Sequence, residues 1–134
     1  MSEPVLPPAG YPSIRRAMMP RDTNAMGFVF GGVILAEMDL AAGIEARLHS
    51  LNPVVTVAFD QVEFKEPVQV GDVVSFHTET VRVGKTSIVV KVDVWAKKRM
   101  GAGRWVAVTE GQVTMVAVDE NMRPTLVTNN PEAF

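Results

Sequence analysis

The chain has 134 residues, of which 47% are hydrophobic and 21% are charged, and its net charge is −2 at pH 7. This size and balance indicate one globular domain over residues 1–134, with residues 1–12 and 125–134 as expected flexible tails. The absence of cysteine excludes disulfide scaffolds, thiol catalysis and cysteine-bound metals, and the absence of a long basic face argues against nucleic acid as the main partner.

The N-terminal segment is rich in proline and has no basic start followed by an apolar run, so it is not typical of a secretory signal. The longest uncharged run, Thr23–Ala36, contains three glycines and is too short to span a bilayer. We therefore expect a soluble, cytoplasmic protein without a membrane span. Within this part of the chain, residues 13–19 form a short predicted strand that ends at Pro20.

A helix is predicted from Gly31 to His49, where alanine, leucine, methionine and glutamate dominate and proline is absent. Apolar residues occur on nearly all sides of this helix. That pattern is typical of a buried helix, not of a helix docked on a surface. Asn52 and Pro53 end the helix.

After Pro53 the hydrophobic period changes to two, which predicts strands over residues 55–64, 73–83, 88–97 and 105–118. A change of phase near Asp60 and Gln61 predicts a bulge in the first of them. Short glycine-containing turns are predicted to join the strands in sequence order, and such turns imply antiparallel pairing. The sequence therefore predicts an α+β fold, in which a curved antiparallel sheet wraps around one long central helix.

Asp39 stands in the middle of the predicted helix. Positions three, four and seven apart share a helix face, and most residues that share this one are small: Gly32, Leu35, Ala36, Ala42, Gly43 and Ala46. One interpretation is a surface acid, or a buried acid with local hydrogen bonds. The other is a carboxylate buried in an apolar groove, which is a natural general base or nucleophile. Glu37 lies about 160° away around the helix and cannot share that face.

Gly31 and Gly32 open the predicted helix. Glycines at this position can serve a tight entry or close packing, but a helix start also offers free N–H groups and the positive end of the helix dipole. Such donors polarise a carbonyl and hold an oxyanion, so the two glycines and Asp39 would line one groove. No metal-ligand spacing surrounds His49 or His77, and we expect no metal and no cofactor.

Basic residues gather at predicted strand ends and turns: Arg82, Lys85, Lys97, Lys98, Arg99 and Arg104. The default interpretation is a solvated rim. The alternative is a site for a phosphate-bearing ligand, for which the stretch RVGKTSI from Arg82 to Ile88 offers cations, hydroxyls and turn amides together.

The stretch MPRDTNAMGFVFGGVILAEMD resembles the signature of the hotdog-fold acyl-CoA thioesterases, in particular the bacterial acyl-CoA hydrolase family. Its pattern is N-x-x-G-x-x-F-G-G followed by a helix and an aspartate, and the matching residues are Asn24, Gly27, Phe30, Gly31, Gly32 and Asp39. The similarity continues through VVTVAFDQVEFKEPVQVGDVV, VGKTSIVVKVDVWAKK and TEGQVTMVAVD, and it spans residues 13–124. As a set, these motifs are specific.

The resemblance implies a hotdog fold in which two protomers form one continuous sheet, with active sites between them and tetramers or hexamers built from such dimers. It implies hydrolysis of an acyl-CoA substrate to a free acid and CoA, without a metal or redox cofactor. Asp39 would act as general base or nucleophile, and Asn24 would position the water or the thioester near Asp39 of the partner subunit. The amides of Gly31 and Gly32 would polarise the carbonyl, and the CoA contacts would come from Arg82, Gly84, Lys85, Thr86 and Ser87.

Three alternatives stay open at this point. A dehydratase of hydroxyacyl thioesters would need a histidine near the active-site helix, where neither His49 nor His77 is expected. A non-catalytic module that binds or senses acyl-CoA would have no need for both Asn24 and a buried Asp39. A purely structural oligomer would leave the acid in the small-residue stripe unexplained.

Overall fold

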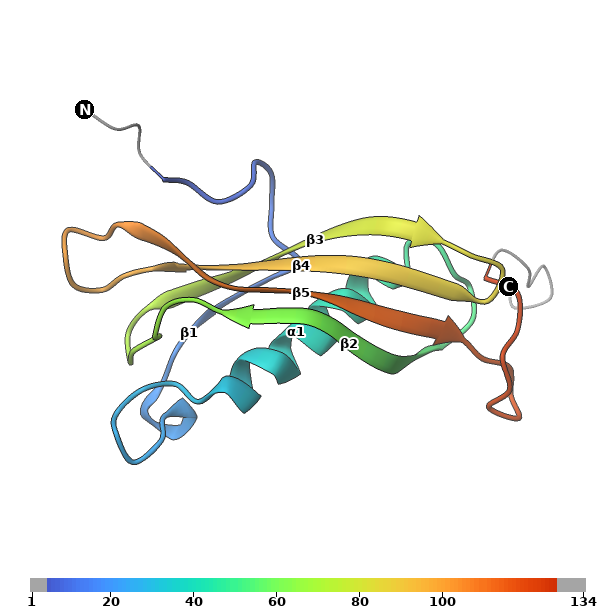
Figure 1. The fold of residues 1–134 in the computed structure, drawn as a ribbon, viewed down its shortest axis with the longest axis horizontal. Coiled ribbons are helices and arrows are strands. Elements are labelled where there is room, and N and C mark those ends of the chain that lie inside the picture. The colour runs from blue at the N-terminus through green and yellow to red at the C-terminus, as the bar shows by residue number, and fades with distance from the viewer. Residues whose placement is uncertain (1–4, 128–134) are drawn as a thin grey trace.

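A computed structural model describes residues 5–127 of the chain. Its elements follow the predicted order, one short strand, one long helix and four long strands (Figure 1), with a single 3₁₀ turn before the helix: β1 Ile14–Ala17, η1 Pro20–Asp22, α1 Gly31–Ala46, β2 Val54–Phe64, β3 Val73–Val83, β4 Ser87–Lys97 and β5 Trp105–Ala117. Within the described residues, no helix is long and apolar enough to cross a membrane.

The regular helix ends at Ala46 and not at His49 as predicted. The amides of Leu48 and His49 donate to carbonyls only three residues back, at 3.0 Å each, so the chain continues past Ala46 in tighter turns. The local preference for helical structure therefore extends through His49, but the α-helical hydrogen bonding does not.

The five strands form one antiparallel sheet in the order β1-β3-β4-β5-β2. Antiparallel pairing was predicted, but the expected pairing in sequence order is wrong for β2, which pairs with β5 and lies at the sheet edge. The eight residues between β2 and β3 carry the chain to the other side of the sheet. On the way, the amide of Val29 donates to the carbonyl of Val68 at 2.8 Å, which ties this crossing to the segment before the helix.

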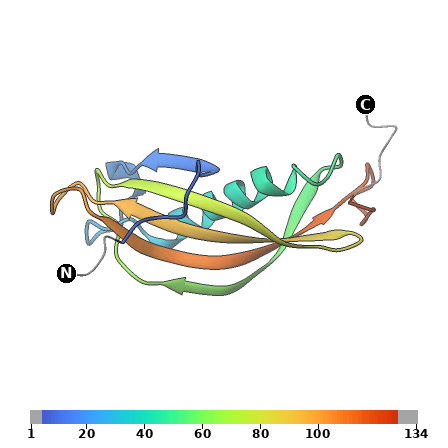
Figure 2. The same cartoon turned by 90° about the horizontal axis from the view of Figure 1, so that it is seen from above.

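The predicted bulge in β2 is confirmed. Gln61 has a φ of 55°, and the register against β5 shifts between Asp60 and Glu63. A bulge bends the strand that carries it and increases the local twist. Figure 2 shows the resulting curved sheet, with α1 lying along one face of it.

The helix packs on the sheet through one side only. Its buried residues recur at helical spacing and belong to the same core as the buried apolar residues of β3, β4 and β5. The buried helix residues are Ile34, Met38, Ala41, Ala42 and Ala46. On the opposite side, Leu40 is 58% exposed and Ile44 is 45% exposed. The prediction that the helix is buried on most faces is therefore wrong for the single chain, because one sheet can cover only one side of a helix.

A buried ion pair ties the crossing before β3 to the turn after β4. Asp72 is 1% exposed, and one of its carboxylate oxygens accepts hydrogen bonds from the Lys98 ammonium and the Gln69 amide, while the other accepts from the Arg99 amide at 2.9 Å. Burial alone would raise the pKa of Asp72, but the Lys98 ammonium and these amides outweigh burial and lower it. Asp72 is therefore a charged anchor for two loops.

The end of the described chain also packs on the sheet. Val127 is fully buried and its amide donates to the carbonyl of Lys85 at 2.8 Å. Residues 125–127 of the expected C-terminal tail are thus held in place, and residues 128–134 and 1–4 lie outside the described part of the chain.

We expect Asp72→Asn to lower the free energy of unfolding by about 3 kcal/mol at neutral pH, because it leaves the Lys98 ammonium without its partner in a buried site. The folded-state pKa of Asp72 lies below the unfolded value, so its contribution is complete above the unfolded pKa and disappears as the pH falls through the folded pKa. Urea titrations at matched protein concentration, at neutral and acid pH, measure both effects. Glu120→Gln, at an exposed acid, is the control. Equal stability of Asp72→Asn and the parent at neutral pH would contradict the anchoring role.

Candidate active site

Asp39 lies at the middle of α1 on the side that faces the edge strand β2. The hydroxyl of Thr56, in β2, donates a short hydrogen bond to its Oδ1 atom. The carboxylate is half-buried and not buried as predicted, because no strand of the same chain lies beyond β2 to cover it. Asp39 is thus held in a fixed orientation at an open edge of the molecule.

A groove of about 360 Å³ runs along this side of the helix. It is lined by residues of α1, the two edge strands and β5: Ile14, Asp39, Leu40, Gly43, Ile44, Arg47, Val54, Thr56 and Met115. A Cβ atom at Gly43 would lie 3.7 Å from the terminal methyl of Met115, so the glycine leaves room there. Of the small-residue stripe predicted from the sequence, only Gly43 lines this groove together with Asp39. Ala42 and Ala46 are buried in the core, and Gly32 and Ala36 are open to solvent.

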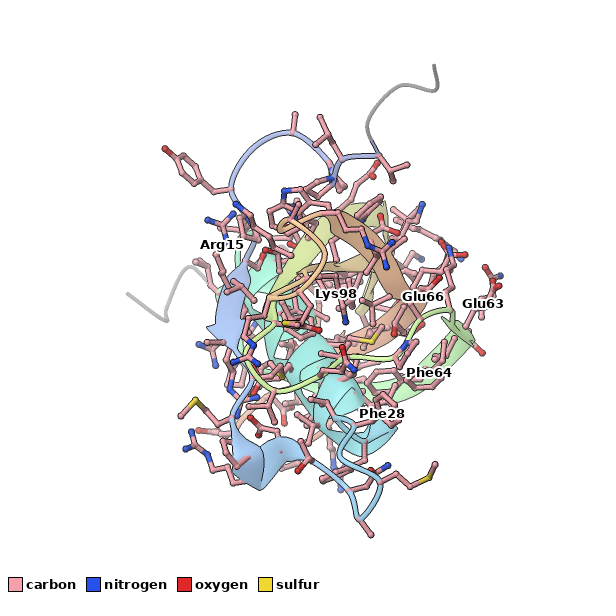
Figure 3. All side chains as sticks on the ribbon, turned by 90° about the vertical axis from the view of Figure 1, so that its left-hand side faces the viewer. Arg15, Phe28, Glu63, Phe64, Glu66 and Lys98 are labelled. Atoms are coloured by element: carbon pink, nitrogen blue, oxygen red, sulfur yellow. The ribbon has the colours of Figure 1, made fainter. Side chains whose placement is uncertain are left out.

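The start of α1 offers two backbone donors. The amides of Gly31 and Gly32 have no hydrogen-bond acceptor among residues 5–127, and the residue before them, Phe30, provides no side-chain cap. A Cβ atom at Gly31 would lie 3.2 Å from the ring of Phe64 in β2. Phe64 and Phe28 both lie near this end of the helix in the end-on view of Figure 3. The helix start therefore presents two N–H donors beside the aromatic rings of Phe64 and Phe28.

The donors and the acid do not meet within one chain. Gly32 and Asp39 are seven residues apart on the same helix, which corresponds to about 10 Å along its axis. A reacting carbonyl must lie within hydrogen-bond reach of its oxyanion donors and close to the attacking atom. The single groove predicted for both therefore cannot serve one carbonyl group in one protomer.

Asn24 lies on the exposed loop between η1 and α1 and makes no hydrogen bond with Asp39 of its own chain. Its Oδ1 atom accepts from the amides of Met26 at 2.9 Å and Phe28 at 3.1 Å. Gly27, with a φ of 86°, allows the turn between them. With its oxygen engaged twice, Asn24 presents its NH₂ group outward as a hydrogen-bond donor.

The predicted ligand-binding stretch Arg82–Ser87 forms the tip of the β3–β4 hairpin. The amide of Gly84 donates to the Ser87 carbonyl at 2.8 Å and closes the turn, and the side chains of Arg82 and Lys85 are exposed. This tip lies at the end of the sheet where α1 ends, whereas Gly31 and Gly32 lie at the other end (Figure 1). Within one protomer, the structure separates the hairpin from the helix start.

Neither histidine lies in the groove. His49 contacts the hydroxyl of Thr80 at 2.9 Å just beyond the helix. His77 lies on the sheet face away from α1, since its neighbour Thr78 bonds Glu45 of the helix at 3.0 Å. Burial and the Arg15 guanidinium lower the pKa of His77, and Asp93 partly offsets them. The structure therefore places no histidine where a dehydratase would need one.

Thr56 is the site residue that the sequence does not predict. It stands in an alternating strand, where a threonine is an ordinary strand former. Its role depends on β2 lying beside α1 at the sheet edge, and the assumed strand order did not provide this arrangement.

The chain is similar to known proteins in sequence and in structure. The family model of the thioesterase superfamily matches residues 26–102. An uncharacterized acyl-CoA thioester hydrolase of Zymomonas mobilis is 46% identical over 123 residues, which are 92% of this chain and 81% of that protein. A hexameric hotdog-fold thioesterase of Campylobacter jejuni has a TM-score of 0.83 and 42% identity over 88% of this chain and 90% of its own. A hexameric broad-specificity acyl-coenzyme A thioesterase has a TM-score of 0.86 and 38% identity over 94% of this chain and 86% of its own.

We expect Thr56→Val to release the Asp39 carboxylate, because valine keeps the shape of threonine and removes the donor. A crystal structure of the variant would show Asp39 in a different rotamer or in several. Thr56→Ser, which keeps the hydroxyl, is the matched control and should retain the parental rotamer. An unchanged, ordered Asp39 in Thr56→Val would show that the hydrogen bond does not orient it.

Proposed function

Since the chain belongs to the thioesterase superfamily, we propose that it hydrolyses acyl-CoA thioesters to a free carboxylic acid and CoA in a site built around Asp39. The hotdog fold predicted from the sequence is confirmed by the similarity to the Campylobacter jejuni thioesterase. The observation that carries the proposal is the Asp39 carboxylate, oriented by Thr56 in a groove between helix and edge strand. We assign residues 1–134 to a single domain and place the protein in the cytoplasm.

Asp39 acts as the general base in this proposal. Thr56 occupies its Oδ1 atom, so the Oδ2 atom is free to accept a proton from water. The water oxygen attacks the thioester carbon, the tetrahedral intermediate breaks its carbon–sulfur bond, and the departing thiolate of CoA takes up the proton from Asp39. Direct attack by the carboxylate, followed by hydrolysis of the anhydride, is the second route that the same geometry allows.

The oxyanion is held by N–H donors. Two donors are the backbone amides of Gly31 and Gly32 at the helix start, and the outward NH₂ group of Asn24 adds a side-chain donor. Since the donors and Asp39 of one chain lie about 10 Å apart, we assign them to opposite protomers. Each active site then combines Asp39 of one subunit with donors, including Asn24, of its partner.

The sheet edge supports this pairing. β2 is an edge strand of 11 residues that pairs with β5 on one side only, and its Val57 is 56% exposed and its Phe59 is 37% exposed. A long apolar edge is a template for pairing with another strand. Pairing of two β2 strands would join the sheets and bring Asp39 next to the partner. Following the hexameric relatives, we assign a hexamer built from such dimers.

The CoA end of the substrate is assigned to the β3–β4 tip. The exposed Arg82 and Lys85 can bind phosphate groups, and the hydroxyls of Thr86 and Ser87 add neutral donors. Gly84 contributes by shaping the turn, which its amide closes through the Ser87 carbonyl. Because the tip lies far from Gly31 and Gly32 of its own chain, it serves a site that spans subunits.

We expect Asp39→Asn to keep the fold and the assembly and to lower kcat for acyl-CoA hydrolysis about 100-fold or more, because the amide cannot accept the proton of the attacking water. The rate of free-thiol release from a panel of acyl-CoAs with short, long and aromatic acyl groups measures this change in kcat. Asp93→Asn, on the opposite sheet face, is the control. Parental rates in Asp39→Asn would refute the catalytic assignment, and no thiol release by the parent would favour a binding module.

Gly32→Val tests the helix start. A Cβ atom at Gly32 would lie 3.3 Å from the Phe30 ring, so a branched side chain there adds bulk at the start of the helix, beside the amides. We expect kcat to fall at least tenfold with an unchanged melting temperature, since the substitution blocks the approach to the oxyanion donors. Gly32→Ala, with a smaller side chain, should retain more activity. Unchanged kinetics of Gly32→Val with a medium-chain acyl-CoA would contradict the role of these amides.

A further inference from the structure

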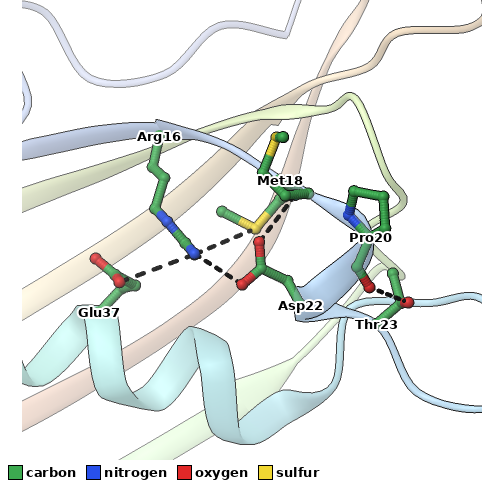
Figure 4. Close-up of polar contacts among 7 residues, drawn as sticks. Arg16, Met18, Pro20, Asp22, Thr23 and Glu37 are labelled. Atoms are coloured by element: carbon green, nitrogen blue, oxygen red, sulfur yellow. Dashed lines mark hydrogen bonds and ion pairs between the residues drawn. The ribbon is translucent and has the colours of Figure 1, made fainter.

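Three elements meet at the guanidinium of Arg16: β1, the turn η1 that precedes the Asn24 loop, and the helix α1 (Figure 4). Arg16 alternates with exposed neighbours in β1 and points toward the helix side of the sheet. One of its terminal nitrogens, Nη2, lies 2.7 Å from Oδ1 of Asp22, and the other, Nη1, lies 3.8 Å from Oε1 of Glu37. Arg16 therefore forms a hydrogen-bonded ion pair with Asp22 and a longer ion pair with Glu37, and the two carboxylates belong to different elements.

Asp22 is the stronger of the two partners. It is 5% exposed, and its second oxygen accepts the amide of Met19 at 2.8 Å. Burial would raise the pKa of Asp22, but the Met19 amide and the Arg16 guanidinium outweigh it and lower the pKa. A charged, buried and doubly bonded carboxylate is a rigid attachment point, unlike an ion pair on the surface.

The backbone connects Asp22 rigidly to Asn24. The amide of Phe30 donates to the Asp22 carbonyl at 3.3 Å, and the amide of Asn24 donates to the Phe28 carbonyl at 2.7 Å. Thr23 and Val29 form an antiparallel bridge between these two bonds. Backbone hydrogen bonds thus cross the loop at several points. Asp22 lies where the loop begins, and Asn24 lies two residues further on.

Glu37 attaches the same guanidinium to the helix. It precedes Asp39 by two residues and lies on the opposite side of α1, so it does not enter the groove. Through Glu37, Arg16 contacts the helical turn that presents Asp39 to the substrate.

We propose that Arg16 is a positioning residue that holds the Asn24 loop at a fixed distance from α1 by binding Asp22 and Glu37 together. This inference rests on the proposed function, and it gives Arg16 no contact with the substrate. In a two-fold dimer each protomer uses the same bridge, so the spacing between Asn24 of one subunit and Asp39 of the partner subunit depends on it.

The planar guanidinium suits this task because its two terminal nitrogens face different elements. Nη2 donates to Asp22 at 2.7 Å, whereas Nη1 contacts the Met18 sulfur at 3.9 Å and attracts the Glu37 carboxylate by charge at 3.8 Å. A lysine ammonium is a single point charge and cannot hold both in fixed directions. A displacement of about 1 Å in a catalytic donor can lower a rate about 100-fold, so the bridge would affect turnover more than substrate binding.

The test begins with kcat and KM of the parent, Arg16→Met, Arg16→Lys and Glu37→Gln. We expect Arg16→Met to lower kcat about tenfold with KM within about twofold of the parent. Arg16→Lys should fold like the parent, by melting temperature, and show a smaller fall in kcat, as should Glu37→Gln. Arg15→Met is the matched control: it lies on the same strand, faces the opposite side and bonds Ser75 at 3.2 Å, and it should keep the parental kcat.

A double-mutant cycle with Asn24→Ala separates positioning from general stability. If Arg16 acts through Asn24, Arg16→Met should have little further effect on kcat in the Asn24→Ala background. A parental kcat in both Arg16→Met and Arg16→Lys, or effects of Arg16→Met and Asn24→Ala that simply multiply, would overturn the inference while hydrolysis by the parent stands. Absence of hydrolysis in the parent would overturn the proposed function and this inference together.

Discussion

The structure depends on one helix that must cover the concave face of a five-stranded sheet. Met38 and Ala41 on one side of α1 are completely buried in the core that the helix shares with the sheet. No other helix of eight or more residues occurs among residues 5–127. Burial of this apolar surface is the largest favourable contribution that so small a domain has. The position of α1 is therefore fixed, and so is that of Asp39 on its flank.

The same constraint leaves the other side of the helix open. Leu40 and Ile44 are exposed beside the groove, and the neighbouring edge strand β2 pairs with β5 on one side only, so its other side is open. A monomer of this shape exposes apolar surface next to its acid, whereas a dimer would cover both. Core packing, subunit pairing and active-site assembly would then be consequences of one arrangement, in which the helix serves as core on one side and as site wall on the other.

The sequence predicts much of the fold because its signals are local. The change in hydrophobic period after Pro53, the small-residue stripe around Asp39 and the phase change at Gln61 each report on a few neighbouring residues, and the structure contains the helix, the strands and the bulge that they predict. The position of β2 at the sheet edge depends on which strands pair over long distances, which local patterns do not encode.

The site could be predicted only in part for the same reason. Asp39, Asn24 and the two glycines stand out as a motif, and each of them is at least partly exposed in the structure. The supporting residues do not stand out, because Thr56 and Arg16 are ordinary residues of alternating strands whose partners lie in other elements. The half-burial of Asp39 could not be read from helical periodicity, which reports the apolar sides of a helix but not how many of them its own chain covers.

The central claim is that one active site combines Asp39 of one subunit with Asn24 of another. Co-expression of two differently tagged chains, one with Asp39→Asn and one with Asn24→Ala, followed by isolation of the mixed assemblies, tests it directly. The account predicts that mixed assemblies recover roughly a quarter of the parental activity, because random pairing leaves one site in four with both residues intact. Activity no higher than that of the two variants measured separately would show that each site lies within a single chain.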